Sequence, residues 1–157
     1  MKDIQIGPTI LVEKLPPFYP GSGLFIADYP DASIDPHDPS RLPEYRSVEL
    51  PACIFPSQRL LVGSLEVITI PDLVFGLVTL RSTWARFGLI SPPTVADPGF
   101  SGQLTFELFN SSSWPILLRP TDKLFKLILV PTIGGEPPYN GRYQGQRGVQ
   151  PSRVLKD

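Results

Sequence analysis

The chain has very few of the side chains that bind zinc or form disulfides. Its 157 residues include one cysteine, Cys53, and one histidine, His37. No disulfide can form within the chain, which fits a reducing compartment. A zinc site built from cysteine and histidine is excluded because the ligands do not exist. His37 lies in a stretch rich in Asp and Pro, so we expect it to be solvated in a loop.

Charged side chains are also scarce. They make up 18% of the sequence, and the net charge is −1. So few charges weakly suggest that part of the surface is hidden in an oligomer. A protein that binds DNA or RNA polymers would carry a basic excess, so such partners are disfavoured. A small phosphorylated ligand needs only a local cluster of arginines and remains open.

No hydrophobic run is long enough for a signal peptide or a membrane span. The first residues, Met1–Leu15, interrupt short apolar pieces with Lys2, Asp3, Glu13 and Lys14. This pattern is neither a secretory leader nor a membrane helix. We therefore expect a cytoplasmic protein without a membrane partner.

Proline and glycine, by contrast, are abundant, with 20 and 13 residues that separate short apolar runs. Such frequent turn-forming and helix-breaking residues favour many short strands over helices. The expected fold is one mostly β domain, residues 1–157, as a sandwich or jelly roll. One short helix is expected at Thr83–Phe87, with Ser82 as its N-cap. The expected extended segments are Ile4–Lys14, Phe18–Tyr29, Val48–Ile54, Leu60–Ile70 with a candidate bulge at Gly63, Val74–Leu80 buried on both faces, Gln103–Phe109, Ile116–Leu118 and Leu124–Val130.

Glu107 stands on the strand with the clearest alternation. Leu104, Phe106 and Leu108 share one face, and Thr105 and Glu107 share the other. In a partly dry site this carboxylate could shuttle protons near neutral pH. It could equally be a surface residue on a wet face, and spacing alone favours that interpretation.

Other polar groups precede this strand. Ser82 and Arg86 would lie on one side of the expected helix, whose first amides could bind an anion together with Arg81. The alternative is a capped helix with two solvated arginines. Asp97 is the first residue of Asp-Pro-Gly, a sequence that is typical of turns. An aspartate in such a turn is more often structural than catalytic. The segment after Pro131 has too few large aliphatics to build much core, so it could order only on a ligand or a neighbouring subunit.

Together, these features resemble a known family. The string RSTWARFGLISPPTVADPGFSGQLTFELFN, residues 81–110, and the string PPYNGRYQGQRGVQPSR, residues 137–153, resemble the dCTP deaminase branch of the trimeric dUTPase superfamily. The resemblance is close over the last half of the chain and loose over the first. It implies a distorted β jelly roll, a homotrimer with active sites between subunits, and a segment 131–157 that is mobile and closes the active site. It also implies deamination without zinc or another tightly bound cofactor, with Mg²⁺ entering only as the nucleotide complex.

The resemblance assigns roles by position. Glu107 matches the glutamate that activates a water to attack C4 of cytosine. Ser82 and Arg86 match residues that hold this water and the charge that develops at the ring, and Arg86 also pairs with Glu107. The matching nucleotide contacts are Arg81 and Thr83 at phosphate, Asp97 at the deoxyribose 3′-hydroxyl, and Tyr139, Arg142 and Gln146 in the closing segment.

The sequence departs from the family pattern in several places. The first-half motif reads Gly-Leu-Phe-Ile at 23–26 without an aspartate in register, the nearest being Asp28, which puts dUTPase-like magnesium handling in doubt. Lys126 replaces a glutamine that binds phosphate in dUTPases, and Arg142 replaces a usual lysine. The loop at Ser91–Thr94 is short, as in archaeal members, so feedback by dTTP cannot be assumed.

Three functions follow as hypotheses. The first is deamination of dCTP to dUTP. The second is a dUTPase in which Asp97 activates a water to attack the α-phosphate, or a bifunctional enzyme that forms dUMP from dCTP. The third is a member without activity that binds a nucleotide or a protein. The complete set around Glu107 favours the first.

Overall fold

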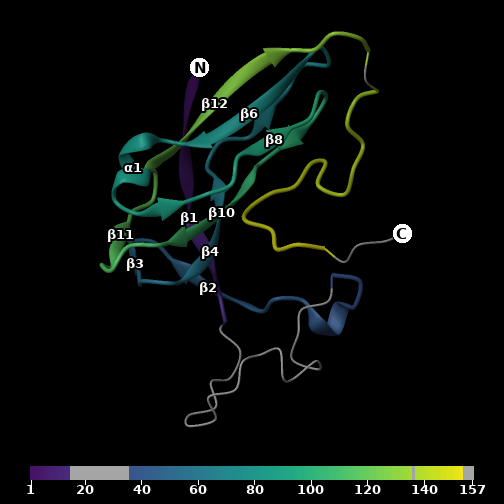
Figure 1. Cartoon of the computed structure of the whole chain (residues 1–157). Coiled ribbons are helices and arrows are strands. Elements are labelled where there is room, and N and C mark those ends of the chain that lie inside the picture. The colour runs from purple at the N-terminus through teal and green to yellow at the C-terminus, as the bar shows by residue number, and fades with distance from the viewer. Residues whose placement is uncertain (15–35, 136, 154–157) are drawn as a thin grey trace.

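The structure is a computed structural model, and it describes residues 1–14, 36–135 and 137–153. The chain is mostly β, as predicted, with one curled sheet and short flanking ribbons (Figure 1). The helices and strands are β1 (Lys2–Glu13), the 3₁₀ helix η3 (Pro39–Arg41), β2 (Tyr45–Glu49), β3 (Ala52–Ile54), β4 (Arg59–Ser64), β5 (Ile68–Thr69), β6 (Val74–Leu80), α1 (Ser82–Arg86), β7 (Leu89–Ile90), β8 (Thr94–Ala96), β9 (Ser101–Gly102), β10 (Thr105–Asn110), β11 (Ile116–Leu118) and β12 (Lys123–Pro131).

The main sheet has the strand order β7-β10-β4-β1-β12-β6-β8, and β2 also pairs with β1. Strand β1 joins its two parts, because its first half pairs with β12 and its second half with β4 and β2. The register shifts between Ile6 and Ile10 of β1, where the sheet bends. The predicted irregularity at Gly63 is found on one side only: Gly63 pairs regularly with Thr105 of β10, but it lies opposite the shift in β1, where Ile6 pairs with Ser64 and Ile10 with Val62.

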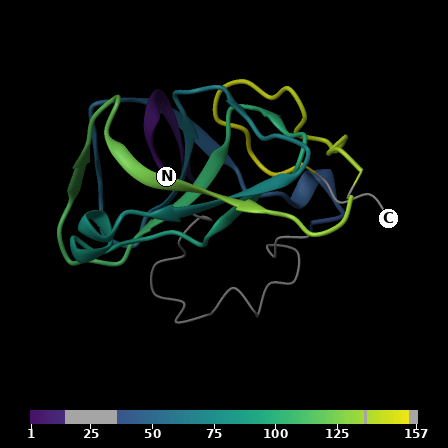
Figure 2. The same ribbon diagram turned by 90° about the horizontal axis from the view of Figure 1, so that it is seen from above.

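The core lies inside the curl of this sheet. Phe106 on β10 and Phe125 on β12 stack with ring centroids 4.1 Å apart. In a flat sheet these strands, three positions apart in the order, would stand roughly 14 Å from each other. Figure 2 shows the sheet from above, folded back on itself. The closed curl buries the apolar face of each strand, including Ile4, Ile10, Leu60 and Leu108.

Several predicted elements differ in detail. The segment 48–54 forms two strands, β2 and β3, because Pro51 cannot donate to a ladder. Val74–Leu80 is a strand with the predicted bounds, but only Gly76 and Val78 are fully buried. Helix α1 begins one residue earlier than expected. Its N-cap is Arg81 rather than Ser82, without a side-chain capping hydrogen bond.

Two further expectations concern the first third of the chain. The extended piece at Phe18–Tyr29 and the motif at 23–26 lie outside the described residues. His37 belongs to a described turn, is exposed, and has an interaction partner. Within the described ranges no helix is long and apolar enough to cross a membrane.

Candidate active site

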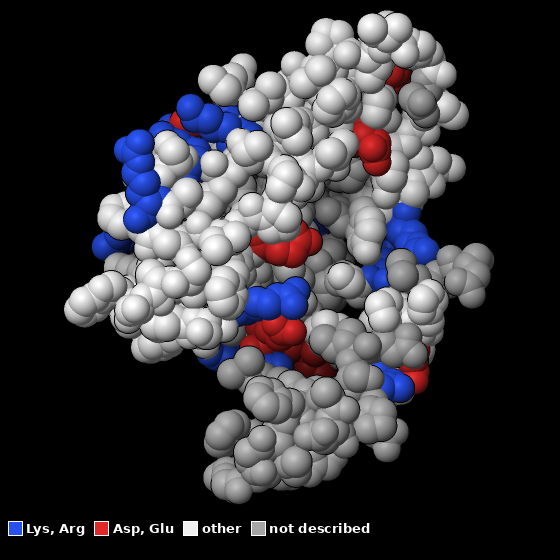
Figure 3. All heavy atoms as spheres, viewed as in Figure 1, with Lys and Arg blue, Asp and Glu red and all other residues white. Residues whose placement is uncertain are grey.

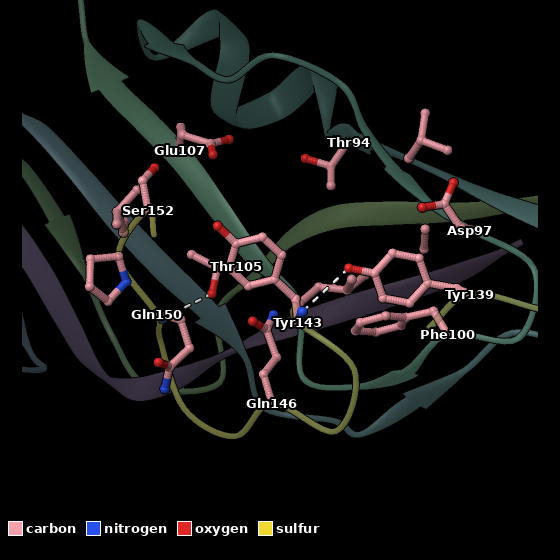
Figure 4. A pocket seen from close by; sticks show the side chains of 15 residues that line it. Thr94, Asp97, Phe100, Thr105, Glu107, Tyr139, Tyr143, Gln146, Gln150 and Ser152 are labelled. Atoms are coloured by element: carbon pink, nitrogen blue, oxygen red, sulfur yellow. Dashed lines mark hydrogen bonds between the residues drawn. The ribbon is translucent and has the colours of Figure 1, made fainter. Parts of the chain in front are cut away.

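A cavity of about 260 Å³ opens on the outer face of the sheet where β4 and β10 run side by side. Strands β4 and β10 form its floor, and β8 with the turn after it forms one wall. The C-terminal segment 137–153 forms the opposite wall (Figure 4). The surrounding surface is largely uncharged, with acidic and basic groups adjoining near the middle of the face in Figure 3. A hollow that combines apolar walls with a few convergent polar groups is a candidate site.

Glu107 lies on the floor of the cavity, directly opposite Leu61 of β4. The strand fixes its direction, because the flanking Phe106 and Leu108 are buried in the core and alternate residues must face outward. Glu107 is exposed in the single chain and forms no ion pair with the described residues. Its carboxylate and Thr94 of β8 project toward the same space in Figure 4.

Asp97 reaches the cavity from the turn after β8. The Phe100 N–H donates to the Asp97 carbonyl at 3.1 Å, and Gly99 has a φ of 78°. Pro98 and Gly99 are therefore the central residues of a turn of type II geometry, which requires a positive φ at the glycine. This turn directs the Asp97 side chain toward Tyr139 (Figure 4).

The C-terminal segment lies along the turn and the start of β10 through backbone hydrogen bonds. Tyr139 N–H donates to Pro98 O at 2.8 Å, and Gly145 N–H donates to Ser101 O at 2.8 Å. Gln103 N–H in turn donates to Gln146 O at 3.0 Å. This pairing places three side chains of the segment, those of Tyr139, Tyr143 and Gln146, at the cavity.

The aromatic part of this wall is held together internally. The Tyr139 ring packs on Phe100, with centroids 5.9 Å apart, and its hydroxyl accepts the N–H of Tyr143 at 3.3 Å. Tyr143 and Tyr139 both pack against the hydrophobic core. The cavity therefore offers flat apolar surfaces beside its carboxylates, which suits an aromatic ring.

Gln146 leaves one acceptor unused. Its Nε2 donates to Gln103 O, while its Oε1 is buried and has no hydrogen-bond partner among the described residues. Buried side-chain oxygens are nearly always hydrogen-bonded in folded proteins. Gln146 lines the cavity, so its side-chain amide is a candidate acceptor for a ligand that donates an N–H.

The four residues predicted on and before α1 lie elsewhere. Arg81, Ser82, Thr83 and Arg86 do not line the cavity of the single chain, and the last three are exposed. The helix is anchored to β12, where Trp84 Nε1 donates to Lys123 O at 2.9 Å. The structure thus brings Glu107, Asp97, Tyr139 and Gln146 together at the cavity. The four residues on and before α1 are not part of this group.

Arg142 faces a second hollow of about 510 Å³. Tyr139, Tyr143 and Ser152 line both hollows, so the two adjoin. Arg153 also lines the second one, and its guanidinium lies 5.3 Å from the centre of the Tyr143 ring. The second hollow therefore supplies positive charge next to the first.

Sequence reasoning missed several residues of the first cavity: Thr94, Thr105, Tyr143, Gln150 and Ser152. The alternation of β10 could have identified Thr105, since it shares a face with Glu107. Nothing local marks the other four, because they come from segments that meet only in the folded chain. Among the described residues no group of three or more His, Cys, Asp or Glu could hold a metal ion.

The comparisons with known proteins agree with the resemblance drawn from the sequence. A model of the dCTP deaminase-like family matches residues 18–132. The dCTP deaminase of Pyrobaculum calidifontis is 36% identical over 157 residues, covering 91% of this chain and 89% of that protein. The dCTP deaminase of Aeropyrum pernix is 48% identical over 99 residues, covering 60% of this chain and 53% of that protein.

The fold also has a counterpart among solved structures. The crystal structure of 2′-deoxycytidine 5′-triphosphate deaminase from Agrobacterium tumefaciens superposes with a TM-score of 0.57 at 17% identity, over 81% of this chain and 38% of that one. The chain spans between 53% and 66% of the relatives from Hyperthermus butylicus, Aeropyrum pernix and Pyrobaculum neutrophilum that it matches. With the match to the family model and to the Pyrobaculum calidifontis protein, the family predicted from the sequence is confirmed: the chain belongs to the dCTP deaminase-like family.

Proposed function

We propose that the protein deaminates dCTP to dUTP and ammonia, with Glu107 as the general base. The observation that carries this proposal is the position of Glu107. Its carboxylate lines a cavity that also holds Asp97, two tyrosines and the unpartnered Gln146 oxygen. Relatives over most of this chain bear the name dCTP deaminase.

The chemistry needs one group that accepts a proton and returns it. Glu107 removes a proton from a water, which adds to C4 of the cytosine ring. The same carboxyl then passes the proton to the leaving amine, the C4–N bond breaks and ammonia departs, while the remaining proton of the water ends on N3 as the C4 carbonyl forms. This exchange needs no oxidant and no protein-bound metal, and general acid–base catalysis of this kind contributes about 10²- to 10⁴-fold.

The size of the hollows suits a divided nucleotide site. Pockets for small molecules usually exceed roughly 300 Å³, so the first cavity, at about 260 Å³, fits a base and sugar rather than a triphosphate. The tyrosines would cover the ring, Asp97 would accept from the sugar hydroxyl, and Gln146 Oε1 would accept an N–H of the base. The adjoining hollow with Arg142 would take the phosphate oxygens of a nucleotide that arrives from solution as its Mg²⁺ complex.

A homotrimer would complete this site. Ser82 and Arg86 are exposed on α1 and do not reach the cavity of their own chain. We propose that they enter the cavity of a neighbouring subunit, where Arg86 pairs with Glu107 and Ser82 holds the attacking water. Apolar residues near α1 and β8 that are exposed in the single chain, such as Phe87, Ile90 and Val95, would then be covered.

The decisive experiment supplies dCTP and dUTP separately and measures ammonia and pyrophosphate. Ammonia from dCTP without pyrophosphate is expected. Glu107→Gln should abolish ammonia release and retain nucleotide binding, whereas the matched control Glu44→Gln, on an exposed surface pair with Lys14, should keep full activity. Ammonia release by Glu107→Gln at the parent rate would remove Glu107 from the mechanism.

The proposal that each active site combines residues of two subunits has its own test. Light scattering at micromolar concentration should give the mass of three chains. Glu107→Gln and Arg86→Gln should each be inactive alone, but mixed trimers should regain part of the activity, since some sites would combine an intact Glu107 with an intact Arg86. A monomeric mass, or no recovery in proven mixed trimers, would contradict the arrangement.

One observation supports a second activity at the same site. Asp97 lines the cavity alongside Glu107, and a carboxylate there could activate a water against the α-phosphate of dUTP. Pyrophosphate from dUTP that is lost in Asp97→Asn, but retained in the exposed control Asp72→Asn, would establish it. Pyrophosphate from dCTP together with ammonia would indicate a bifunctional enzyme.

A further inference from the structure

A row of charged and polar side chains crosses the sheet next to Glu107 and has no part in the chemistry above. Arg59 begins β4, Glu13 ends β1 and Tyr45 begins β2. Glu13 is paired directly with Tyr45 across the strands, and its carboxylate lies 3.4 Å from Arg59 Nε. The Glu13 side chain is only 14% exposed, although it stands on the outer face of the sheet.

The register places this row beside the cavity floor. Glu107 is opposite Leu61, Leu61 is opposite Leu11, and Phe109 is opposite Arg59. Because alternate residues of a strand share a face, Arg59 lies on the same face as Glu107. The two form a diagonal cross-strand pair, and such neighbours are typically about 7–8 Å apart, within reach of a long side chain.

The pKa of Tyr45 is influenced both by the charges of this row and by Glu107. Burial raises the pKa of the Tyr45 phenol, and the Glu13 carboxylate raises it further. Arg59 acts on the pKa in the opposite direction, and Glu107 raises it as well. The charges of all three side chains are thus felt at a single phenol.

Arg59 stands between two carboxylates with unequal surroundings. Glu13 is largely removed from water and binds the guanidinium through Nε. Arg59 itself is 55% exposed, and its guanidinium forms no ion pair with Glu107 in the single chain. An arginine held at one end by a buried partner keeps its charge at a defined place at small entropic cost.

We propose that Arg59 is a positioning residue, which places a positive charge beside Glu107 and directs its carboxylate into the cavity, and that Glu13 sets the strength of this effect by holding the guanidinium. The role deepens the proposed deamination, since a general base must be unprotonated before it can activate water. Within the same chain, the other titratable groups that line the cavity with Glu107 are Asp97, from the turn after β8, and Tyr139 and Tyr143, from the C-terminal segment. In the proposed trimer, Arg86 of a neighbouring subunit would also face Glu107.

The two charges of the pair predict opposite effects on the pH profile. Removing the positive charge of Arg59 disfavours the ionised carboxylate, so the acid limb of kcat/KM moves to higher pH in Arg59→Gln. Removing the negative charge of Glu13 frees the full charge of Arg59, so the acid limb moves to lower pH in Glu13→Gln. Solvent screening limits each shift to roughly half a pH unit, about a threefold change on the acid limb.

The variants are compared on the intact protein, with dCTP turnover measured from about pH 5 to pH 9. Arg59→Lys should keep the parent profile, because it keeps the charge. Arg46→Gln is the matched control, an exposed cation on β2 that neighbours Tyr45 but faces the other side of the sheet. Thermal unfolding shows whether each variant is folded at the assay temperature.

A second measurement does not depend on the activity. In protein with ¹³C-labelled glutamate, the Glu107 carboxyl signal, assigned by its loss in Glu107→Gln, should titrate at higher pH in Arg59→Gln and at lower pH in Glu13→Gln. These shifts without ammonia from dCTP would support the coupling and refute the proposed reaction. The role of Arg59 would be overturned if kcat/KM fell equally at all pH values in the variants. It would also be overturned if the acid limb moved in the same direction in Arg59→Gln and Glu13→Gln.

Discussion

The backbone N–H of Gln150 donates to Thr105 Oγ1 at 3.0 Å, which ties the end of the chain to the strand that carries Glu107. Thr105 stands two residues before Glu107 on the same face of β10. Nearby, Gly148 N–H donates to Gln103 Oε1 at 2.7 Å. With the Gln103–Gln146 hydrogen bonds, these two contacts join the wall of the cavity to its floor, and the volume for a ligand depends on them.

Thr105→Val should loosen this wall without damaging the core. The variant keeps the shape of the side chain but loses the acceptor for Gln150, and a neutral hydrogen bond of this kind contributes about 1 kcal/mol. We expect the KM for dCTP to rise about fivefold with a smaller change in kcat, measured by steady-state kinetics. Thr9→Val, which loses an exposed hydrogen bond to Glu49 far from the cavity, should leave KM unchanged. An equal KM in both variants would show that the Gln150 contact does not shape the site.

Gly63→Ala tests how closely the segment approaches the sheet. A Cβ at Gly63 would lie 3.2 Å from the backbone nitrogen of Val149, so the segment must move outward. Amide hydrogen exchange should accelerate at residues 146–150, while the thermal midpoint changes little because alanine is tolerated in a strand. Gly7→Ala is the matched control, since its Cβ would make only an ordinary contact, 3.8 Å from Gly63 O. Unchanged exchange in Gly63→Ala would mean that the segment does not rest on β4.

Tyr45→Phe should change the stability of the protein in alkali. Burial raises the pKa of Tyr45 above its usual 10.0, so the folded state keeps the phenol proton when the unfolded chain has lost it. The resulting stability is present below the unfolded pKa and is lost as the pH rises through the folded pKa. Between about pH 8 and pH 11, the parent should therefore lose more free energy of unfolding than Tyr45→Phe. Urea unfolding at both pH values measures the difference, and equal losses would contradict a buried, protonated Tyr45.

The strands that carry the site were predictable because their signal is local. Along β10, apolar and polar residues alternate, so the pattern alone placed Phe106 inward and Glu107 outward. Val74–Leu80 and Ile116–Leu118 have the predicted bounds, since turn residues limit each run. The capping of α1 was not predictable in this way. Arg81 takes the N-cap position while it donates to Lys123 O and pairs with Asp3, and both partners are distant in sequence.

The alternation, the turns and the family could be read from the chain before folding, because they depend on neighbouring residues and on matching strings. Which side chains share a cavity depends on how the strands pair. The curl of the sheet and the path of the C-terminal segment bring Asp97, Glu107, Tyr139 and Gln146 together, and the register of β1, β2 and β4 brings Arg59 and Glu13 beside them. Such proximity arises because strands far apart along the chain pair with each other, so a local sequence pattern cannot predict it.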